Sequence, residues 1–352
     1  MRVESIRGSK FWDASDPFVF EDNVSLSEWA HNQDHLAHHV FFRTSGSSGV
    51  QKWIALSKDA LRWSAESVIE HLQITAEDVC ALALPVHHVG GFGLVARCEF
   101  SGARLVEFSG AWSPVSFRDF CDEQKVTLTS LVPTQVSDLV SQNLTAPASL
   151  REIIVGGGHL DSSLTERARS LGWPVFPSYG MTETASQIAT GDHLPLIEGW
   201  EARVVDDLLE VKGEGLLSGI ITKKENGFHF DNPKSGGWFR TSDRVELYER
   251  NLTFISRADR RIKVLGELVD LDALEEFWAE LTGAEVAVIA RPDDRRVHTL
   301  HLFYTGSGTT VASKNAELPG PERLESWFHL SSLPRTELGK IDRLQMTRIQ
   351  LD

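Results

Sequence analysis

Six consecutive small residues, Thr44 to Gly49, form the stretch that most constrains this chain. An apolar run at residues 40–42 precedes them and predicts a buried strand, and Lys52 follows closely. From Ser57 onward, apolar residues at helical spacing predict a helix. Glycines let backbone N–H groups approach an anion, hydroxyls donate hydrogen bonds, and the lysine adds positive charge. The stretch therefore predicts a phosphate-binding loop, with a flexible serine-glycine linker as the simpler alternative.

The composition is that of an ordinary globular protein. A chain of 352 residues can form a large domain and a small one, and 41% hydrophobic with 24% charged residues is typical of that class. The net charge of −15 argues against nucleic-acid binding, and no segment has the apolar length of a membrane span or a signal peptide. The three cysteines show no metal-binding spacing, so we expect a reducing, cytoplasmic location.

Four histidines cluster near the N-terminus, at His31, His35, His38 and His39. Histidines at this spacing could bind a metal ion from a helix, but no acidic or cysteine ligand pattern accompanies them. We therefore interpret the segment as a surface helix.

Strands and helices alternate between residues 79 and 176. The expected strands are residues 79–84, 104–108, 126–131, 152–155 and 174–176. The expected helices are residues 116–124, 134–141 and 160–171. This alternation predicts a doubly wound α/β domain of parallel strands, with ligand contacts in the loops at the carboxyl ends of the strands. Residues 199–256 change to short alternating strands, which predict a small antiparallel β-subdomain.

Several loops of the α/β region carry candidate ligand contacts. His88 follows the strand at residues 79–84 and could flank a substrate, and a buried structural histidine is an equal alternative. The triple glycine at residues 156–158 could let a nucleotide ring lie against bare backbone, although a tight turn explains it as well. The segment SYGMTET, residues 178–184, places a hydroxyl beside a carboxylate, as a helix N-terminus also would.

Five motifs, taken in chain order, resemble those of the adenylate-forming superfamily of acyl-CoA synthetases. The small-residue loop is similar to T-S-G-[ST]-[ST]-G-x-P-K, with Gln51 at the place of the proline. The segment SYGMTET is similar to Y-G-x-T-E. The segment GWFRTSD, residues 237–243, is similar to G-W-[FY]-x-T-G-D, with Ser242 at the place of the glycine.

The last two motifs lie in the C-terminal third of the chain. Residues 255–276 are similar to G-R-x-D-x-x-I-K-x-x-G-x-x-[IV]-x-x-x-E-[IL]-E, with Ser256 at the place of the first glycine. Residues 333–343, LPRTELGKIDR, are similar to P-x-T-x-x-G-K-[IV]-x-R. One short motif could match the family by chance. Five motifs in the family's order are poorly explained by chance.

The resemblance implies a division into two domains. An adenylation domain for ATP and the acyl substrate would cover residues 1–258 and include the β-subdomain at residues 199–256. Asp259 would be the hinge to a small, mobile α+β domain at residues 260–352. In that domain we expect helices at residues 271–281 and 322–330 and strands at residues 285–290 and 300–304.

The resemblance also implies roles for individual side chains. The Tyr179 ring would pack against adenine, Glu183 would hold Mg²⁺, and Asp243 would bind the ribose hydroxyls. Gly266 would line the pantetheine tunnel for CoA. The catalytic residues that it implies are Lys340, Thr182, Glu183 and His88. The residues that it implies for ATP or AMP binding are Thr44, Ser45, Gly46, Ser47, Ser48, Gly49, Lys52, Gly156, Gly157, Gly158, Ser178, Tyr179, Gly180, Met181, Asp243 and Arg257.

The activity that the resemblance implies is ATP-dependent ligation of a small aromatic or acyl carboxylic acid to CoA. The acid would react with ATP to give an acyl-adenylate and pyrophosphate, and CoA would then displace AMP, with Mg²⁺ and local positive charge stabilising the first step. The alternatives are a stand-alone adenylation enzyme that delivers to a carrier protein and a binding protein on an inactive scaffold. Neither nucleic acid nor a membrane is an expected partner, and a homo-oligomer is an open alternative.

Overall fold

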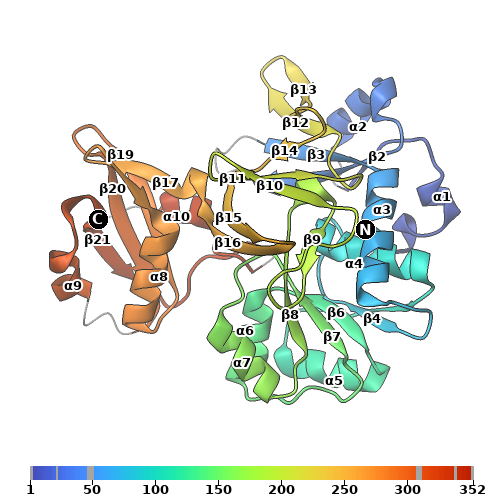
Figure 1. The fold of residues 1–352 in the computed structure, drawn as a ribbon, viewed down its shortest axis with the longest axis horizontal. Helices are drawn as coiled ribbons and strands as arrows, with labels where there is room; N and C mark the ends of the chain where they lie inside the picture. The colour runs from blue at the N-terminus through green and yellow to red at the C-terminus, as the bar shows by residue number, and fades with distance from the viewer. Residues whose placement is uncertain (1–2, 21–22, 46–50, 307–310, 337–338, 350–352) are drawn as a thin grey trace. The chain divides into compact units, whose positions relative to one another are not determined.

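The computed structural model of the chain describes residues 3–20, 23–45, 51–306, 311–336 and 339–349. The chain forms two compact units (Figure 1). The first unit consists of Met1–Arg203, Glu210–Arg240 and Leu247–Thr253, and the second consists of Val204–Leu209, Thr241–Glu246 and Phe254–Asp352. The expected hinge residue, Asp259, lies inside the second unit, and its role as a hinge stays a prediction.

The larger sheet of the first unit has the strand order β5-β4-β6-β7-β8-β9. Its strands are β4 (Val79–Leu82), β5 (Arg104–Glu107), β6 (Leu128–Leu131), β7 (Glu152–Val155), β8 (Val175–Gly180) and β9 (Gln187–Thr190). Neighbours from β5 to β8 are parallel, and β9 is antiparallel to β8. The connecting helices are α4 (Val89–Ser101), α5 (Pro114–Gln124), α6 (Pro133–Ser141) and α7 (Ser162–Ser170). Parallel strands alternating with helices confirm the expected α/β class.

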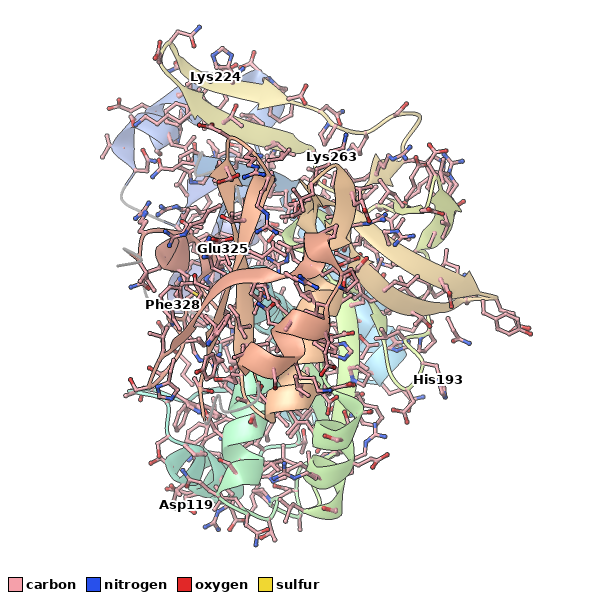
Figure 2. The ribbon with its side chains drawn as sticks, turned by 90° about the vertical axis from the view of Figure 1, so that its left-hand side faces the viewer. Asp119, His193, Lys224, Lys263, Glu325 and Phe328 are labelled. Carbon is pink, nitrogen blue, oxygen red and sulfur yellow. The ribbon has the colours of Figure 1, made fainter. Side chains whose placement is uncertain are left out.

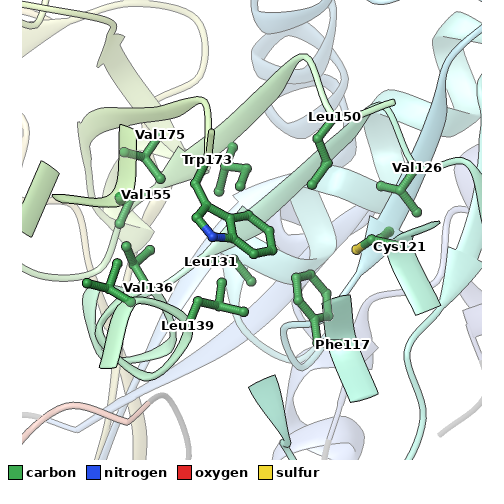
Figure 3. Close-up of a cluster of buried hydrophobic side chains, with 14 residues drawn as sticks. Phe117, Cys121, Val126, Leu131, Val136, Leu139, Leu150, Val155, Trp173 and Val175 are labelled. Carbon is green, nitrogen blue, oxygen red and sulfur yellow. The ribbon is translucent and has the colours of Figure 1, made fainter. Parts of the chain in front are cut away.

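Helices cover both faces of this sheet. Figure 3 shows the core on one face, where Trp173 packs among side chains of the sheet, α5 and α6. Cys80 and Ala81 are neighbours on β4, so their side chains point to opposite faces. Ala81 joins that core, whereas the thiol of Cys80 hydrogen-bonds with that of Cys98 on α4. α4 therefore packs on the other face, which gives the doubly wound arrangement.

The second sheet of the first unit has the order β1-β2-β3-β12-β13. Its strands are β1 (Phe18–Val19), β2 (His39–Ser45), β3 (Gln51–Ser57), β12 (Gly219–Lys224) and β13 (Gly227–Asp231). β3 leads into α3 (Lys58–Leu72), the expected helix, whose buried residues include Leu61, Ala65, Val68 and Leu72. We expected the small-residue loop to lead directly into this helix. That expectation is wrong, because the strand β3 lies between them. The middle of β3, residues 53–56, is buried throughout and shows none of the alternation that marks a half-buried strand.

The short strands expected between residues 199 and 256 are present, but they divide among three sheets. β12 and β13 complete the five-stranded sheet, where Ile221 of β12 lies opposite Trp53 of β3. β10 (Glu201–Val205), β11 (Leu208–Lys212) and β14 (Phe239–Arg240) form a second sheet. β15 (Asp243–Tyr248) pairs with β16 (Asn251–Arg257) in a third.

From Arg261 onward, the second unit is a small α+β body. Its sheet has the order β19-β20-β21, and a hairpin of β17 and β18 precedes it. The strands are β17 (Arg261–Val264), β18 (Glu267–Asp270), β19 (Val286–Asp293), β20 (Val297–Tyr304) and β21 (Leu324–His329). The helices are α8 (Leu271–Thr282), α9 (Val311–Glu317) and α10 (Arg343–Thr347). Trp278 of α8 packs against Val288 and Leu302 in the core of this unit.

The helix expected at residues 322–330 is wrong, because η5 (Gly320–Glu322) and the strand β21 occupy this segment. β21 pairs in parallel with β20. Figure 2 labels two of its residues: Glu325 forms an ion pair of 2.9 Å with Arg296, and the Phe328 ring stacks on Phe303. This pairing with β20 is a long-range contact that outweighs the local helical spacing.

The residues before β2 form η1 (Val3–Ile6), α1 (Ser9–Trp12), α2 (Val24–His31) and η2 (Asp34–Leu36). His31 ends α2, whereas His39 begins β2, where burial lowers its pKa. Within the described ranges, no three His, Cys, Asp or Glu side chains gather to hold a metal ion. In the same ranges, no helix combines the length and apolar character needed to cross a membrane.

Candidate active site

β2 and β3, the strands on either side of the small-residue stretch, pair as an antiparallel hairpin. Thr44 lies directly opposite Lys52, and Ser45 lies opposite Gln51. Side chains of opposite residues project from the same face of a sheet, so the Thr44 hydroxyl and the Lys52 ammonium lie on one side of the hairpin. Gly46, Ser47, Ser48 and Gly49 lie outside the described residues. The hairpin thus places a hydroxyl and a cation together at the base of the expected phosphate loop.

The segment 178–184 begins on β8 and ends in η3 (Thr182–Thr184). Gly180 must be glycine, because a Cβ there would lie 2.1 Å from the carbonyl oxygen of Ser186. The Thr184 hydroxyl accepts a hydrogen bond from the Met181 N–H at 3.0 Å and donates one to the Ser186 carbonyl oxygen at 2.8 Å. These contacts fix the turn that presents the candidate catalytic threonine and glutamate.

The triple glycine lies beside this segment. A Cβ on Gly156 would lie 2.9 Å from the Ser178 hydroxyl, which donates a hydrogen bond of 3.3 Å to the Val155 carbonyl oxygen. Gly157 has a φ of +79°, a conformation that favours glycine. Because β7 and β8 are parallel neighbours, the two segments meet at the carboxyl edge of the sheet, where open α/β sheets bind ligands.

Backbone contacts tie Glu183 to the sheet that carries the hairpin. The Leu217 N–H donates to the Glu183 carbonyl oxygen at 2.8 Å. The next residue, Ser218, donates its N–H to the carbonyl oxygen of Ala55 on β3 at 2.8 Å. The structure therefore brings η3, which carries Glu183, beside the strand that carries Lys52.

His88 directly precedes α4, and its ring centre lies 4.4 Å from that of His87. The first turn of α4 packs tightly here, because a Cβ on Gly91 would lie 2.3 Å from the Pro85 carbonyl oxygen. The histidine pair thus sits after the carboxyl end of β4, at the same edge of the sheet as the glycine and SYGMTET segments.

Arg97 is a candidate site residue that the sequence reasoning missed. It lies on α4, is 1% exposed, and donates to Gln187 Oε1 at 2.7 Å and to Ser186 Oγ at 3.4 Å. Its Nε and Nη1 atoms are buried and have no hydrogen-bond partner among the described residues. Burial lowers its pKa to about 10, so Arg97 stays charged at neutral pH. The sequence signal that could have indicated Arg97 is a charged residue within the otherwise apolar run FGLVARC, residues 92–98.

In the second unit, Arg257 gathers two of the predicted site residues. Its Nη1 lies 3.2 Å from Asp243 Oδ1, and its Nε and Nη2 each donate to Asp259 at 2.9 Å. Asp243 is 5% exposed. Burial raises the pKa of Asp259, but hydrogen bonds and charge from Arg257 outweigh it and hold that pKa below its ordinary value. The three side chains form one cluster in which the guanidinium lies between two carboxyl groups.

Two further predicted residues belong to the same unit. Gly266 forms the turn between β17 and β18 with a φ of +87°, and the preceding Leu265 also has a positive φ, of +53°. The Lys340 carbonyl oxygen accepts a hydrogen bond from the Thr336 N–H at 2.8 Å. The Lys340 side chain keeps solvent contact, yet desolvation lowers its pKa, and the charge of Arg257 lowers it further.

Glu275 on α8 connects these parts, a role that the sequence alone did not reveal. Its Oε1 lies 2.7 Å from Arg260 Nη2 and accepts hydrogen bonds from Arg343 Nε at 3.2 Å and the Val288 N–H at 2.8 Å. Arg260 ends η4 (Ala258–Arg260), and Arg343 follows the Lys340 segment. Glu275 therefore connects Arg343, three residues after Lys340, with Arg260, which follows Asp259 of the cluster around Arg257.

The donor set fits a magnesium ion carried by a nucleotide. Mg²⁺ in such sites is held by one or two carboxylates together with substrate phosphates and water, rather than by an all-protein cage. Glu183 offers one carboxylate beside the strand of Lys52, and the described part of the chain contains no cluster that would hold a metal ion by itself.

Comparison with known proteins identifies the class. The family described as AMP-binding enzyme matches residues 13–219, which is more than half of the chain. The chain belongs to the AMP-binding enzyme family, in agreement with the resemblance carried by its five motifs.

The curated relatives define a narrower group. The 2-succinylbenzoate–CoA ligase of Staphylococcus epidermidis (strain ATCC 35984) is 28% identical over 353 residues, covering 92% of this chain and 72% of the relative. The ligase of the same name from Escherichia coli (strain K12) is 29% identical over 249 residues, covering 67% of this chain and 51% of the relative. The segments LVPTQ, residues 131–135, and SYGMTETASQI, residues 178–188, indicate the same ligase, and these relatives confirm that resemblance.

Solved structures of this group share the fold. The o-succinylbenzoate–CoA synthetase from Bacillus subtilis in complex with ATP and magnesium ion matches with a TM-score of 0.74 and 25% identity, covering 88% of this chain and 69% of that chain. The same enzyme in complex with its acyl-adenylate intermediate matches with a TM-score of 0.75 and 24% identity, over the same shares of both chains.

Proposed function

We propose that this chain is an AMP-forming acid–thiol ligase that converts 2-succinylbenzoate, ATP and CoA into 2-succinylbenzoyl-CoA, a step of menaquinone biosynthesis. Membership of the AMP-binding enzyme family and the curated relatives support the ligase activity. The observation that supports 2-succinylbenzoate as the acid is Arg97. It is a buried guanidinium whose Nε and Nη1 lack partners among the described residues.

A buried cation of this kind favours a substrate with a second negative charge. 2-Succinylbenzoate has two carboxyl groups, so one can be activated while the other stays ionised. The ionised group can accept charge-assisted hydrogen bonds from Arg97. Gly93, one turn earlier on α4, has no side chain to crowd the guanidinium, since a Cβ there would lie 3.2 Å from Arg97 Nη2. A monocarboxylic acid would leave the same donors unsatisfied.

In the first half-reaction, the acid carboxylate attacks the α-phosphorus of ATP, and the bond to pyrophosphate breaks. We assign Thr44, Lys52 and the loop between them to the phosphates, and the segments 156–158 and 178–181 to the nucleoside. Glu183 would hold Mg²⁺, which supplies positive charge on the phosphates. Thr182 and Lys340 are assigned to the oxygens on which negative charge develops.

In the second half-reaction, the CoA sulfur attacks the acyl carbon, AMP leaves with the electron pair of the anhydride bond, and the thiol proton passes to solvent. We assign His88 to the flank of the acyl group and Gly266 to the path of the pantetheine arm. Asp259 is the proposed hinge by which the second unit exchanges Lys340 for the Gly266 turn between the two steps.

ATP–pyrophosphate exchange tests this proposal on the purified full chain. The acids would be 2-succinylbenzoate, benzoate and a fatty acid, and the CoA thioester would be identified by mass. Exchange and thioester formation with 2-succinylbenzoate are expected. Exchange with benzoate or the fatty acid alone would make the chain another aryl- or acyl-CoA ligase. Exchange without any thioester would favour delivery to a carrier protein.

Cys80, Cys98 and Cys121 are free, buried thiols, which suit a reducing compartment. On this ground we propose a cytoplasmic location. Light scattering on the purified chain would decide between a monomer and a homo-oligomer.

A further inference from the structure

Ser242 and Arg257 are joined by a hydrogen bond that glycine, the family's usual residue at this place, cannot make. Ser242 Oγ accepts from Arg257 Nη2 at 2.8 Å. The Ala258 N–H also donates to the Ser242 carbonyl oxygen, at 2.7 Å. Two contacts therefore hold the residue before Asp243 against the start of η4.

This hydrogen bond gives the Arg257 guanidinium a third side-chain partner, in addition to Asp243 and Asp259. An arginine offers five N–H donors in a rigid plane. Asp259 receives two of those of Arg257, Asp243 lies opposite Nη1, and Ser242 accepts from Nη2. The Arg257 side chain is 45% exposed, so without such contacts it would sample several rotamers.

We propose that Ser242 is a positioning residue: its hydroxyl holds Arg257 between the Asp243 and Asp259 carboxylates and thereby pre-organises nucleotide binding in the second unit. The inference rests on the proposed function and on the nucleotide contacts that the family resemblance implies for Asp243 and Arg257. Pre-organised groups lose less conformational freedom when the ligand binds. Loss of one hydrogen bond of this kind should weaken AMP binding about three- to tenfold.

The test is calorimetric titration of AMP, which needs no acid substrate. Ser242→Ala removes the hydroxyl, and Ser242→Thr keeps it and should restore the affinity. Ser256→Ala is the matched control, because Ser256 also stands at a family glycine and its buried hydroxyl has no partner among the described residues. We expect weaker AMP binding for Ser242→Ala alone, with an unfolding temperature equal to that of Ser256→Ala.

A double-mutant cycle separates positioning from a merely structural role. If Ser242 acts through Arg257, Ser242→Ala should cost no further affinity in an Arg257→Gln background. Equal losses in both backgrounds, or wild-type affinity in Ser242→Ala, would overturn the inference. If the wild-type chain binds AMP but does not activate 2-succinylbenzoate, the proposed acid substrate is wrong. The AMP affinities of the Ser242 variants still decide the inference in that case. A wild-type chain that binds no AMP overturns both.

Discussion

The guanidinium of Arg97 donates a hydrogen bond of 2.7 Å to the side-chain oxygen of Gln187, although Arg97 is almost completely buried. The bond joins α4 to β9, the strand that follows η3 and its Glu183. A single polar contact thus links the helix after the His88 pair to the strand after the proposed magnesium ligand. If Arg97 binds the acid as proposed, a change at Arg97 should affect the reaction of the acid before it affects that of ATP.

Arg97→Met keeps the length of the side chain and removes its charge. We expect kcat/KM for 2-succinylbenzoate to fall about tenfold to a hundredfold, the usual worth of charge-assisted hydrogen bonds. The KM for ATP should stay within about twofold, because the change does not touch the proposed phosphate groups. Steady-state pyrophosphate release measures both constants.

The change leaves the buried side-chain oxygen of Gln187 without its donor, so we expect the free energy of unfolding to fall by about 1–3 kcal/mol while the chain stays folded. Arg118→Met, a partly exposed arginine on α5, is the control for a general effect of removing a charge. An equal loss of activity with a monocarboxylic acid would show that Arg97 supports the fold rather than the second carboxylate.

Glu183→Gln keeps the shape of the proposed magnesium ligand and removes its charge. Loss of a preorganised electrostatic contact should lower kcat/KM by about 2–4 kcal/mol of transition-state stabilisation. The loss should be greatest at limiting Mg²⁺, so the rate is measured across a magnesium titration. Glu201→Gln, an exposed glutamate paired with Lys212, is the matched control. An unaltered kcat/KM at low Mg²⁺ would remove Glu183 from this role.

The glycine-rich and charged motifs could be predicted from the sequence because their constraints are local. Gly180 tolerates no Cβ, and Gly157 and Gly266 have positive φ, so each glycine records a backbone requirement at its own position. Asp243 and Arg257 also keep recognisable neighbours in the chain. The structure then supplies what the motifs lack, namely the cluster that Arg257 forms with Asp243 and Asp259.

The elements that were missed depend on partners distant in the chain. β3 is an inner strand because β12, far along the chain, pairs with it, and β21 is a strand because it pairs with β20. Arg97 shows no spacing pattern, since its partner Gln187 lies on another element. Local periodicity contains none of this information, so such features appear only once the tertiary contacts are known.

Asp78 gives a prediction about stability at the opposite end of the sheet, where β4, β6 and β7 begin. Burial raises its pKa, but hydrogen bonds from Arg151, the Thr75 N–H and the Thr127 hydroxyl outweigh burial and lower the pKa to about 2. A lowered carboxyl pKa stabilises the fold above the unfolded pKa, and this contribution is lost as the pH falls from about 4 to about 2.

Asp78→Asn should therefore reduce the free energy of unfolding by about 2 kcal/mol at pH 7. The difference from wild type should shrink below about pH 4, because the wild-type carboxyl then takes up its proton. Urea unfolding at pH 7, 4 and 3 measures it. Asp122→Asn removes a carboxylate from the exposed pair with Lys125 and should change little. A pH-independent difference would mean that packing, not charge, explains the loss.

Lys340 and Gly266 lie on the same unit but are assigned to different half-reactions. Lys340→Ala should abolish adenylate formation and still allow a supplied acyl-adenylate to react with CoA. Gly266→Leu should do the reverse, because a branched side chain at the turn would obstruct the thiol while leaving the phosphate groups intact. Single-turnover kinetics of each half-reaction, for each variant, measures the split.

The conformation of Gly266 demands a control of its own. A Cβ there would meet no atom within 4 Å, so the turn has room, but its φ of +87° is unfavourable for leucine. Asparagine tolerates the left-handed region better and is shorter, so Gly266→Asn should retain more of the thioester step than Gly266→Leu does. Equal damage from both substitutions would assign the effect to the backbone of the turn. Loss of both half-reactions in Lys340→Ala and in Gly266→Leu would mean that the two positions serve one fixed site, and the hinge at Asp259 would then have no part in the reaction.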